Sequence, residues 1–286
     1  MSIIEKAVGN LNTNASAGGM HAGNRRKLNG TDSLRNKQIA YKYQEVEIDQ
    51  VGLRSHSIEL DKTSSTAYEF KKIKRPLLDN LVAGGNLNDG SFGANFIVVT
   101  SAVPGEGKTH TSLNLAISLS YERDYDVIFV DGDTIKRDAS LLLGMGEQPG
   151  LNDLLNDDAA VIDEHIYQTN LNKLKVLPSG TANENTCELL SSERMTGILE
   201  HLMRVENRII LFDAPPMLAT VEASVLTRLA GQVLIVTEAA QTSKSMVQSV
   251  LDQIDDNKPV GMVLNKSKKE HGEKVYGSYY DNYRQL

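Results

Sequence analysis

A glycine-rich turn between an apolar run and a helix-like segment constrains this chain more than any other feature. Residues 102–109 read Ala-Val-Pro-Gly-Glu-Gly-Lys-Thr, which fits the P-loop pattern of Ala or Gly, four residues, Gly, Lys and Ser or Thr. The run "FIVVTS" before the turn is typical of a buried strand, and "TSLNLAISLS" after it is typical of a helix. The alternative is an ordinary strand-to-helix connection with incidental glycines. The strand and helix on either side count against it and favour a nucleotide-binding loop.

Each residue type in the turn has a physical role in holding a triphosphate. Gly105 and Gly107 let main-chain N–H groups point at phosphate oxygens without obstruction. Lys108 can reach the β- and γ-phosphates, and Thr109 can place its hydroxyl on Mg²⁺. We therefore expect ATP and Mg²⁺ as cofactors. The residues predicted to contact the nucleotide are Pro104, Gly105, Glu106, Gly107, Lys108, Thr109, His110 and Asn265.

Two of these nucleotide contacts have plain structural alternatives. His110 directly follows the loop, and a place on the surface of the helix explains it equally well. Asn265 ends the apolar run "GMVLN", where it would approach the adenine or simply form a turn.

Three carboxylates follow strand-like runs and are expected near the loop. "VIFVDGD" supplies Asp131 and Asp133, and "IILFDAPP" supplies Asp213. The carboxyl ends of parallel strands share one edge of a sheet, and a lone buried carboxylate is costly without a nearby cation or donor. A helix cap or turn residue is the alternative for each. We predict a catalytic set of Lys108, Asp131, Asp133 and Asp213, with Asp131 or Asp133 as proton acceptor, and a metal-binding set of Thr109, Asp131 and Asp213.

Strand-like and helix-like segments alternate along most of the chain. The predicted strands are 95–102, 126–133, 174–180, 208–216, 231–239 and 259–266, and the predicted helices are 109–121, 139–144, 151–156, 187–205, 220–229 and 243–254. Continuous apolar strands that alternate with helices indicate an α/β fold. We expect a P-loop NTPase-type parallel sheet flanked by helices on both faces.

Composition divides the chain into three parts. Residues 1–66 are polar and predict a mostly disordered arm, with local order allowed near "YQEVEIDQVGL". Residues 67–268 form the predicted P-loop domain, whose first helix, at 67–82, is expected to kink or restart at Pro76. Residues 269–286 form a flexible tail that holds four of the ten tyrosines: Tyr276, Tyr279, Tyr280 and Tyr283.

Charge and cysteine content limit the partners and the compartment. A net charge of −7 gives no general case for nucleic-acid binding. The single cysteine, Cys187, cannot form an internal disulfide, which fits a reducing cytoplasm. No apolar stretch approaches the roughly 20 residues that span a bilayer. We therefore expect a cytoplasmic protein that reaches a membrane only through a partner.

Four motifs, in order, resemble those of the bacterial tyrosine kinase (BY-kinase) family: "AVPGEGKT", "VIFVDGD", "ILFDAPP" and "YGSYYDNY". The likeness covers roughly residues 67–286, and "EFKKIKRPLL" is similar to the N-terminal helix of the autokinase subgroup encoded with exosortase and exopolysaccharide systems. This resemblance implies an ATP-dependent protein-tyrosine autokinase that phosphorylates its tail in trans within a ring-like homo-oligomer. It also implies control of exopolysaccharide polymerisation or export, a separate membrane co-polymerase as activator at the inner membrane, and a tyrosine phosphatase.

The chain departs from the family pattern in two places. Ile135 stands where the family's second motif usually has arginine, and whether Lys136 or Arg137 replaces it stays open. Glu69, Lys72 and Arg75 stand where an oligomerisation helix commonly reads Glu-x-x-Arg-x-x-Arg, so that contact is expected to be weaker, or the stretch is simply a solvated helix face.

Related ATPases of the MinD/ParA type are the main alternative. They usually carry a second lysine five positions before the P-loop lysine, where this chain has Val103. The alternative functions are a MinD/ParA-like ATPase switch and a nucleotide-binding scaffold without tyrosine kinase activity.

Overall fold

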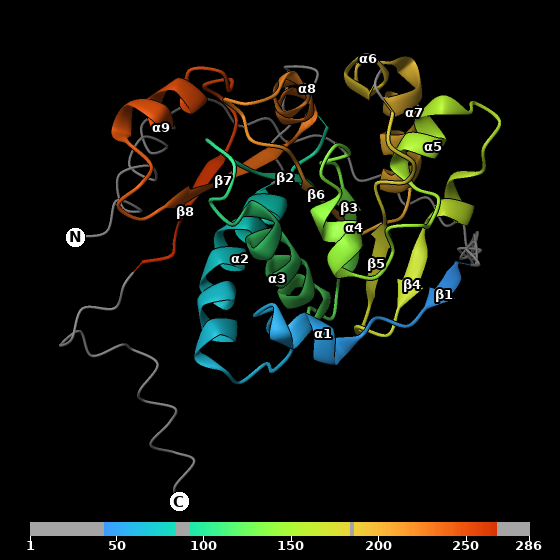
Figure 1. The fold of residues 1–286 in the computed structure, drawn as a ribbon, viewed down its shortest axis with the longest axis horizontal. Coiled ribbons are helices and arrows are strands. Elements are labelled where there is room, and N and C mark those ends of the chain that lie inside the picture. The colour runs from blue at the N-terminus through green and yellow to red at the C-terminus, as the bar shows by residue number, and fades with distance from the viewer. Residues whose placement is uncertain (1–42, 84–91, 184–185, 268–286) are drawn as a thin grey trace, which may run out of the picture. The chain divides into compact units, whose positions relative to one another are not determined.

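The computed structural model describes residues 43–83, 92–183 and 186–267 (Figure 1). Most of the predicted arm, residues 1–42, and the tail with its four tyrosines lie outside the described residues. No helix in the described ranges is both long and apolar enough to cross a bilayer.

One eight-stranded sheet organises the described domain. Its order is β1-β4-β5-β3-β6-β2-β7-β8. The strands are β1 (Gln44–Val46), β2 (Phe96–Ser101), β3 (Asp126–Asp131), β4 (Tyr167–Thr169), β5 (Leu174–Leu177), β6 (Arg208–Asp213), β7 (Gln232–Glu238) and β8 (Val260–Asn265). The parallel sheet predicted from the sequence is confirmed with one difference: β4 and β5 pair antiparallel. Only residues 170–173 join these two strands, and so short a connection cannot make a parallel crossover.

The helices occupy nearly all the segments that the sequence predicts. They are α1 (Gln50–Ser55), α2 (Ser65–Ala83), α3 (Lys108–Ser120), α4 (Asp138–Leu142), α5 (Leu151–Asn156), η2 (Ile162–His165), α6 (Thr186–Leu190), α7 (Glu193–Met203), α8 (Val221–Leu229) and α9 (Lys244–Leu251). The helix expected at 187–205 is divided, because the Ser192 hydroxyl accepts a hydrogen bond from Met195 N and begins α7. The helix α2 continues through Pro76 as one element.

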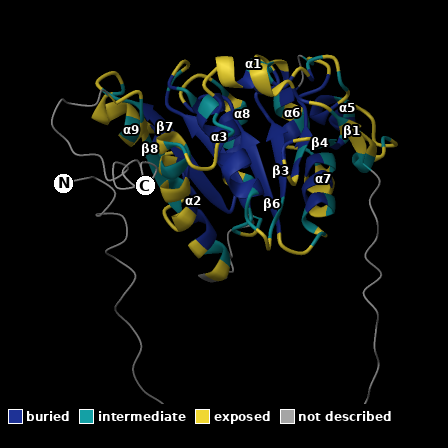
Figure 2. Cartoon of the chain, turned by 90° about the horizontal axis from the view of Figure 1, so that it is seen from below, coloured by how far each residue is buried: buried dark blue, intermediate teal, exposed yellow. Residues whose placement is uncertain are grey.

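Two apolar cores lie on opposite faces of the sheet. Successive strand residues point to opposite faces. Phe96 and Val98 therefore join the core under α5, α7, α8 and α9, while Ile97 and Val99 join the core under α1, α2, α3 and α4. Figure 2 shows the sheet as a buried layer between helices whose outer surfaces are exposed. Helices on both faces are thus confirmed.

The ordered domain begins before residue 67, the boundary expected from composition. Within residues 43–66, β1 pairs with β4, and α1 begins at a cap in which Asp49 accepts a hydrogen bond from Val51 N at 2.9 Å. Ile48, Leu53 and Ile58 are buried against the α2–α3 side of the sheet. These three apolar residues recur every fifth position, a spacing that matches neither a helix nor a strand, so periodicity missed them.

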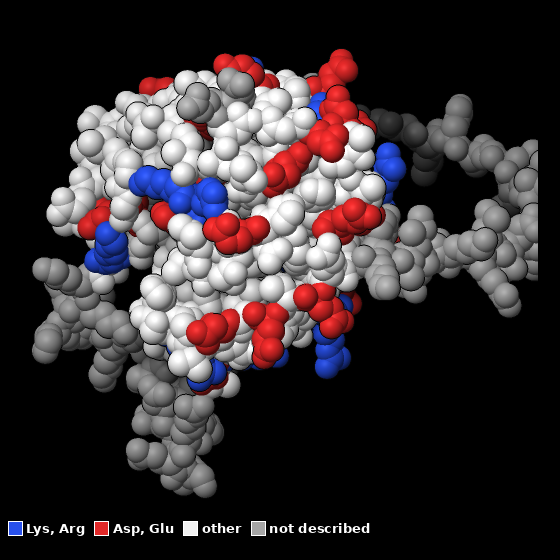
Figure 3. Space-filling view, turned by 45° about the vertical axis from the view of Figure 1, so that its right-hand side comes forward, with Lys and Arg blue, Asp and Glu red and all other residues white. Residues whose placement is uncertain are grey.

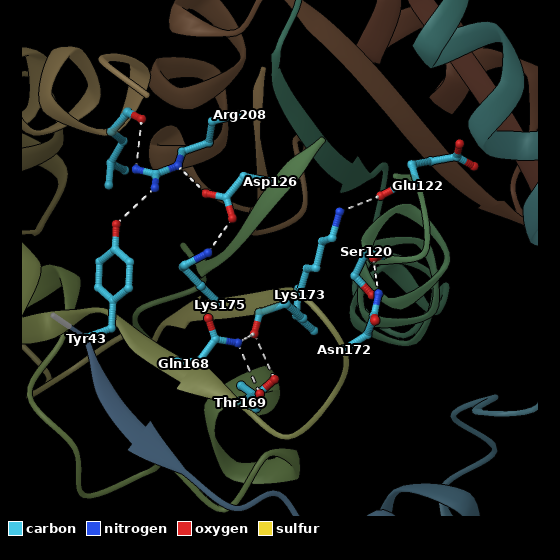
Figure 4. A network of polar contacts seen from close by, with 12 residues as sticks. Tyr43, Ser120, Glu122, Asp126, Gln168, Thr169, Asn172, Lys173, Lys175 and Arg208 are labelled. Carbon is cyan, nitrogen blue, oxygen red and sulfur yellow. Dashed lines mark hydrogen bonds and ion pairs between the residues drawn. The ribbon is translucent and has the colours of Figure 1, made fainter. Parts of the chain in front are cut away.

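A polar network fastens the strands at the edge where β3 and β6 begin (Figure 4). Arg208 is 2% exposed and donates to Asp126 Oδ2 at 2.7 Å, to Tyr43 OH at 2.9 Å and to Leu202 O at 3.2 Å. Lys175 pairs with the other oxygen of Asp126. The start of β1, the end of α7 and three strands are therefore held by one guanidinium group and one carboxylate.

The surface agrees with the acidic composition. On the face shown in Figure 3, acidic side chains are spread widely, while basic side chains form small groups. This distribution fits the net charge of −7.

Candidate active site

The loop between β2 and α3 adopts a backbone that depends on its glycines. Gly105 and Gly107 both have φ of +91°, in the left-handed region that side chains rarely adopt. At Gly107 an added Cβ would also lie 2.1 Å from Asn265 Nδ2. Gly107 directly precedes α3, so the first N–H groups of that helix face the hollow of the loop.

Lys108 lies among the carboxylates that the sequence predicts around it. Its Nζ is 2.7 Å from Asp133 Oδ2, 3.6 Å from Asp213 Oδ2 and 3.2 Å from Thr109 Oγ1. The side chain is nearly buried, and burial by itself would lower the pKa of the ammonium group. Asp213 and Asp133 outweigh burial and raise that pKa, so Lys108 stays charged.

Thr109 joins the loop to the end of β6. Its hydroxyl donates to Asp213 Oδ2 at 2.6 Å. Asp213 is fully buried, and burial raises the pKa of its carboxyl group, with Lys108 and Thr109 opposing the rise. Within the described part of the chain, Asp213 Oδ1 has no hydrogen-bond partner. One oxygen is thus held by Thr109, and the other is available to a ligand.

Asp131, at the end of β3, is held by one residue of α4. Its Oδ2 accepts from Ser140 N at 2.8 Å and from Ser140 Oγ at 2.6 Å. Ser140 Oγ in turn accepts from Ser179 N at 2.9 Å. Burial, and then the charge of Asp213, raise the pKa of Asp131 to about 7, against the lowering effects of Ser140 and Lys108. Among the described residues, Asp131 Oδ1 has no hydrogen-bond partner.

Glu106 braces the loop from inside and was predicted only as a nucleotide contact. Its Oε2 accepts from Val103 N at 2.8 Å, and its Oε1 accepts from the Thr242 hydroxyl. The carboxylate is therefore directed at the loop's own main chain and at the segment after β7, which leaves main-chain groups of Glu106 to face a phosphate.

The end of β8 also contacts the loop. Asn265 Nδ2 donates to Glu106 O at 2.8 Å, and Lys266 Nζ donates to Gly105 O at 2.8 Å and pairs with Glu238 Oε2 at 2.8 Å. Asn265 thus lies beside the loop, as expected of a residue near the nucleotide, although its amide bonds the loop itself.

Two other predicted contacts lie at the margin of the loop. His110 Nε2 is 2.8 Å from Ser57 O, so its ring is turned to the segment after α1. Pro104 is exposed at the tip of the loop.

The side chains of residues 135–137 face solvent or another loop. Ile135 is 63% exposed, and Lys136 is also exposed. The guanidinium group of Arg137 bonds Gly146 O. The structure therefore turns the guanidinium group of Arg137 to the loop at Gly146.

Sequence reasoning missed Ser140 and Thr242. Ser140 holds Asp131, nine residues before it, and Thr242 holds Glu106, 136 residues before it. Serine and threonine in short polar stretches carry no pattern that predicts such contacts.

The donor set fits Mg²⁺ together with a nucleotide triphosphate. Mg²⁺ in phosphate-transfer sites uses one or two carboxylates, water and substrate phosphates rather than a full cage of protein ligands. The described residues contain no group of three or more His, Cys, Asp or Glu side chains placed so that they could hold a metal ion by themselves. Thr109 and Asp213, with Asp131 beside them and one unpartnered oxygen on each aspartate, match that smaller requirement. The fold and this site define a P-loop nucleotide-binding domain.

Comparisons with known proteins agree with this class and narrow it. The AAA domain family model matches residues 94–266, which is more than half of the chain. The tyrosine-protein kinase CpsD of Streptococcus pneumoniae is 33% identical over 193 residues, covering 65% of this chain and 82% of CpsD. EpsB of Ralstonia nicotianae is 32% identical over 196 residues. This match covers 67% of this chain but only 25% of EpsB.

Solved structures also share the fold of this chain. The chimerical protein CapA2B2 superposes with a TM-score of 0.64 at 26% identity, covering 81% of this chain and 97% of that chain. The septum site-determining protein MinD of Pyrococcus horikoshii shares the fold with a TM-score of 0.50 at 24% identity, covering 65% of this chain and 75% of that chain. The chain belongs to the AAA domain family and, within it, to the bacterial tyrosine-protein kinases.

Proposed function

We propose that the chain is an ATP-dependent protein-tyrosine autokinase that phosphorylates Tyr276, Tyr279, Tyr280 and Tyr283 of a neighbouring copy. The observation that carries the proposal is the pair of buried aspartates beside Lys108. Each aspartate keeps one oxygen without a hydrogen-bond partner among the described residues. This arrangement fits phosphoryl transfer, in which positioning and charge stabilisation supply most of the catalysis.

The residues have separate roles in the proposed reaction. The phenol oxygen of the acceptor attacks the γ-phosphorus, the bond from that phosphorus to the β,γ-bridging oxygen breaks, and ADP leaves. Asp131 accepts the phenolic proton, since its pKa of about 7 leaves a large deprotonated fraction at neutral pH. Lys108 stabilises the charge on the transferred group. Asp133 holds the ammonium group of Lys108 in place.

Thr109 and Asp213 would hold Mg²⁺, with Asp131 on the neighbouring strand as a further candidate ligand. The metal ion would supply charge neutralisation at the phosphates. Gly105, Gly107 and the first turn of α3 would hold the phosphates through main-chain N–H groups.

The wider role follows from the likeness of the motifs to those of BY-kinases. We infer regulation of exopolysaccharide polymerisation or export, activation by a separate membrane co-polymerase, reversal by a tyrosine phosphatase, and recruitment from the cytoplasm to the inner membrane. The exposed side chains of α2 support a contact between copies: Lys72 pairs with Glu69 and Arg75 pairs with Asp79, all at the surface. Such exposed pairs are weak and free to exchange partners.

Replacement of all four tail tyrosines by phenylalanine tests the assignment. We expect loss of nearly all phosphotyrosine, measured by mass spectrometry after incubation with Mg-ATP, and unchanged ATP affinity by calorimetry. Transfer between copies is tested by mixing this variant with a Lys108→Met protein whose tail is intact. Phosphate on the Lys108→Met copy supports transfer in trans, and an unlabelled Lys108→Met copy beside an active unsubstituted protein refutes it.

The ATPase switch remains the second candidate, because MinD shares the fold. Radiolabelled ATP separates the two functions. Label in protein tyrosine supports the kinase, whereas release of free phosphate without labelled tyrosine supports the switch.

A further inference from the structure

A cleft of about 700 Å³ opens beside the P-loop and is not part of the phosphate cradle. It is lined by the segment that leads into α1, by α1 itself and by α4 with the turn after it, and it meets the loop at Thr109. The end of β8 borders the loop elsewhere, at Gly105 and Gly107. A molecule in the cleft would therefore approach the site from the side of the predicted metal ligand.

The short helix α4 forms one wall of this cleft. Its inner residue Ser140 is 1% exposed and holds Asp131 through two hydrogen bonds. Its outer residues Asp138 and Leu141 line the cleft, and Leu141 is 58% exposed. A ligand in the cleft thus lies against the same helix that fixes the proposed proton acceptor.

The cleft combines negative charge with an apolar patch. Glu47, Asp49 and Asp138 are exposed carboxylates on its lining, and Leu141 and Leu142 supply apolar surface. A volume of about 700 Å³ is large enough to hold several side chains of a peptide. The chemistry that fits is an extended peptide with an aromatic ring and a neighbouring cation.

We propose that the cleft binds the acceptor segment of a second copy of this chain, residues 273–285, with a basic side chain of that segment beside Glu47. This inference rests on the proposed kinase function and names how the acceptor is selected. Lys274 lies two residues before Tyr276, and Arg284 directly follows Tyr283. The chain end from residue 268 spans up to about 60 Å when extended, at roughly 3.3 Å per residue.

The order of phosphorylation follows from the same charges. Tyr276 has Lys274 two residues before it and no carboxylate within two residues, whereas Asp281 directly follows Tyr280 and lies two residues before Tyr283. An acidic cleft disfavours a second carboxylate beside the acceptor. We expect phosphate on Tyr276 before Tyr280 in a mass-spectrometric time course, and Tyr280 phosphorylated first would contradict the inference.

The decisive experiment uses two proteins, so that the cleft and the acceptor tail can be changed separately. The kinase copy carries phenylalanine at all four tail tyrosines, and the acceptor copy carries Lys108→Met with an intact tail. Glu47→Lys in the kinase copy is expected to lower labelling of the acceptor about three- to fivefold, the effect of one partly exposed charge pair. A tail with Lys274→Glu and Arg284→Glu should lower labelling by the original kinase copy and raise it again with the Glu47→Lys copy.

Glu45→Lys is the matched control, because Glu45 is exposed on the same segment and does not line the cleft. Unchanged labelling with Glu47→Lys, an equal loss with Glu45→Lys, or no recovery in the charge-reversed pair would overturn the inference. Calorimetry with Mg-ATP on each kinase copy shows whether a loss of labelling comes from the cleft or from lost nucleotide binding. Normal nucleotide affinity and normal labelling by the original kinase copy leave the kinase assignment standing when the cleft assignment fails.

Discussion

Asp131 and Asp213 are register partners on the neighbouring parallel strands β3 and β6, and both are fully buried. Two carboxylates side by side in a water-poor sheet edge oppose each other's ionisation. Lys108 reduces that repulsion, and a bound cation would reduce it further, so the arrangement favours ligands that bring positive charge.

Stability should depend on pH through Asp131. Its pKa of about 7 in the folded chain lies above the ordinary value of 3.8, so between these values the folded chain binds more protons than the unfolded chain. This carboxyl group therefore costs stability as pH rises from about 4 to about 7, by an amount on the order of a few kcal/mol. The free energy of unfolding of Asp131→Asn minus that of the original protein should be larger at pH 8 than at pH 5. Urea unfolding without nucleotide measures this difference. An equal difference at both pH values would contradict the raised pKa.

Lys108→Met should strongly slow transfer while leaving the fold in place. The ammonium group is the charge that faces Asp133 and Asp213, and loss of one such stabilising group typically costs about 10²- to 10³-fold in rate. Labelling of tail tyrosine with radioactive ATP measures the loss. Lys258→Met is the matched control, since Lys258 is also buried but donates to the carbonyl groups of Thr227 and Arg228 at the end of α8. A similar loss of transfer in a folded control would refute a specific role for Lys108.

Gly107→Ala should remove nucleotide binding. The new Cβ would be strained at φ of +91° and would lie 2.1 Å from Asn265 Nδ2, so the loop or β8 must move. Calorimetry with Mg-ATP should show at least tenfold weaker affinity. Adding Asn265→Ala relieves the contact but not the strained backbone, so the double variant should recover only part of the affinity. Full affinity in Gly107→Ala would contradict the description of the loop.

Arg208→Met should destabilise the domain without changing its chemistry. It leaves Asp126 and Tyr43 without their shared donor, and breaking a buried ion pair costs about 3–5 kcal/mol. Lys175 still pairs with Asp126, which places the expected loss near the lower end of that range. Urea unfolding measures the loss, and the ATP affinity of the folded variant should match that of the original protein. Weaker ATP binding by the folded variant would show that the two edges of the sheet are coupled.

The main elements could be predicted from the sequence because their signals are local. The apolar runs of β2, β3, β6 and β7 and the glycines of the loop are patterns within a few residues. The strand β4 could not be found this way, because its three residues carry no apolar period and its pairing depends on distant partners.

The positions of the three aspartates could be predicted from local signals of the same kind, but the contacts that hold them could not. Asp131, Asp133 and Asp213 follow obvious strands, and the structure brings all three around Lys108. The contacts that hold these groups, such as Ser140 with Asp131, join positions whose spacing has no local meaning.

The contact between Lys266 and Gly105 has a practical consequence for anyone who shortens this protein. The tyrosine-bearing end starts immediately beyond a lysine that is fastened to the loop between β2 and α3. A truncation placed before Asn265 would therefore remove two supports of that loop along with the acceptors, and its inactivity would say nothing about the tyrosines. A stop codon after Ser267 separates the two effects.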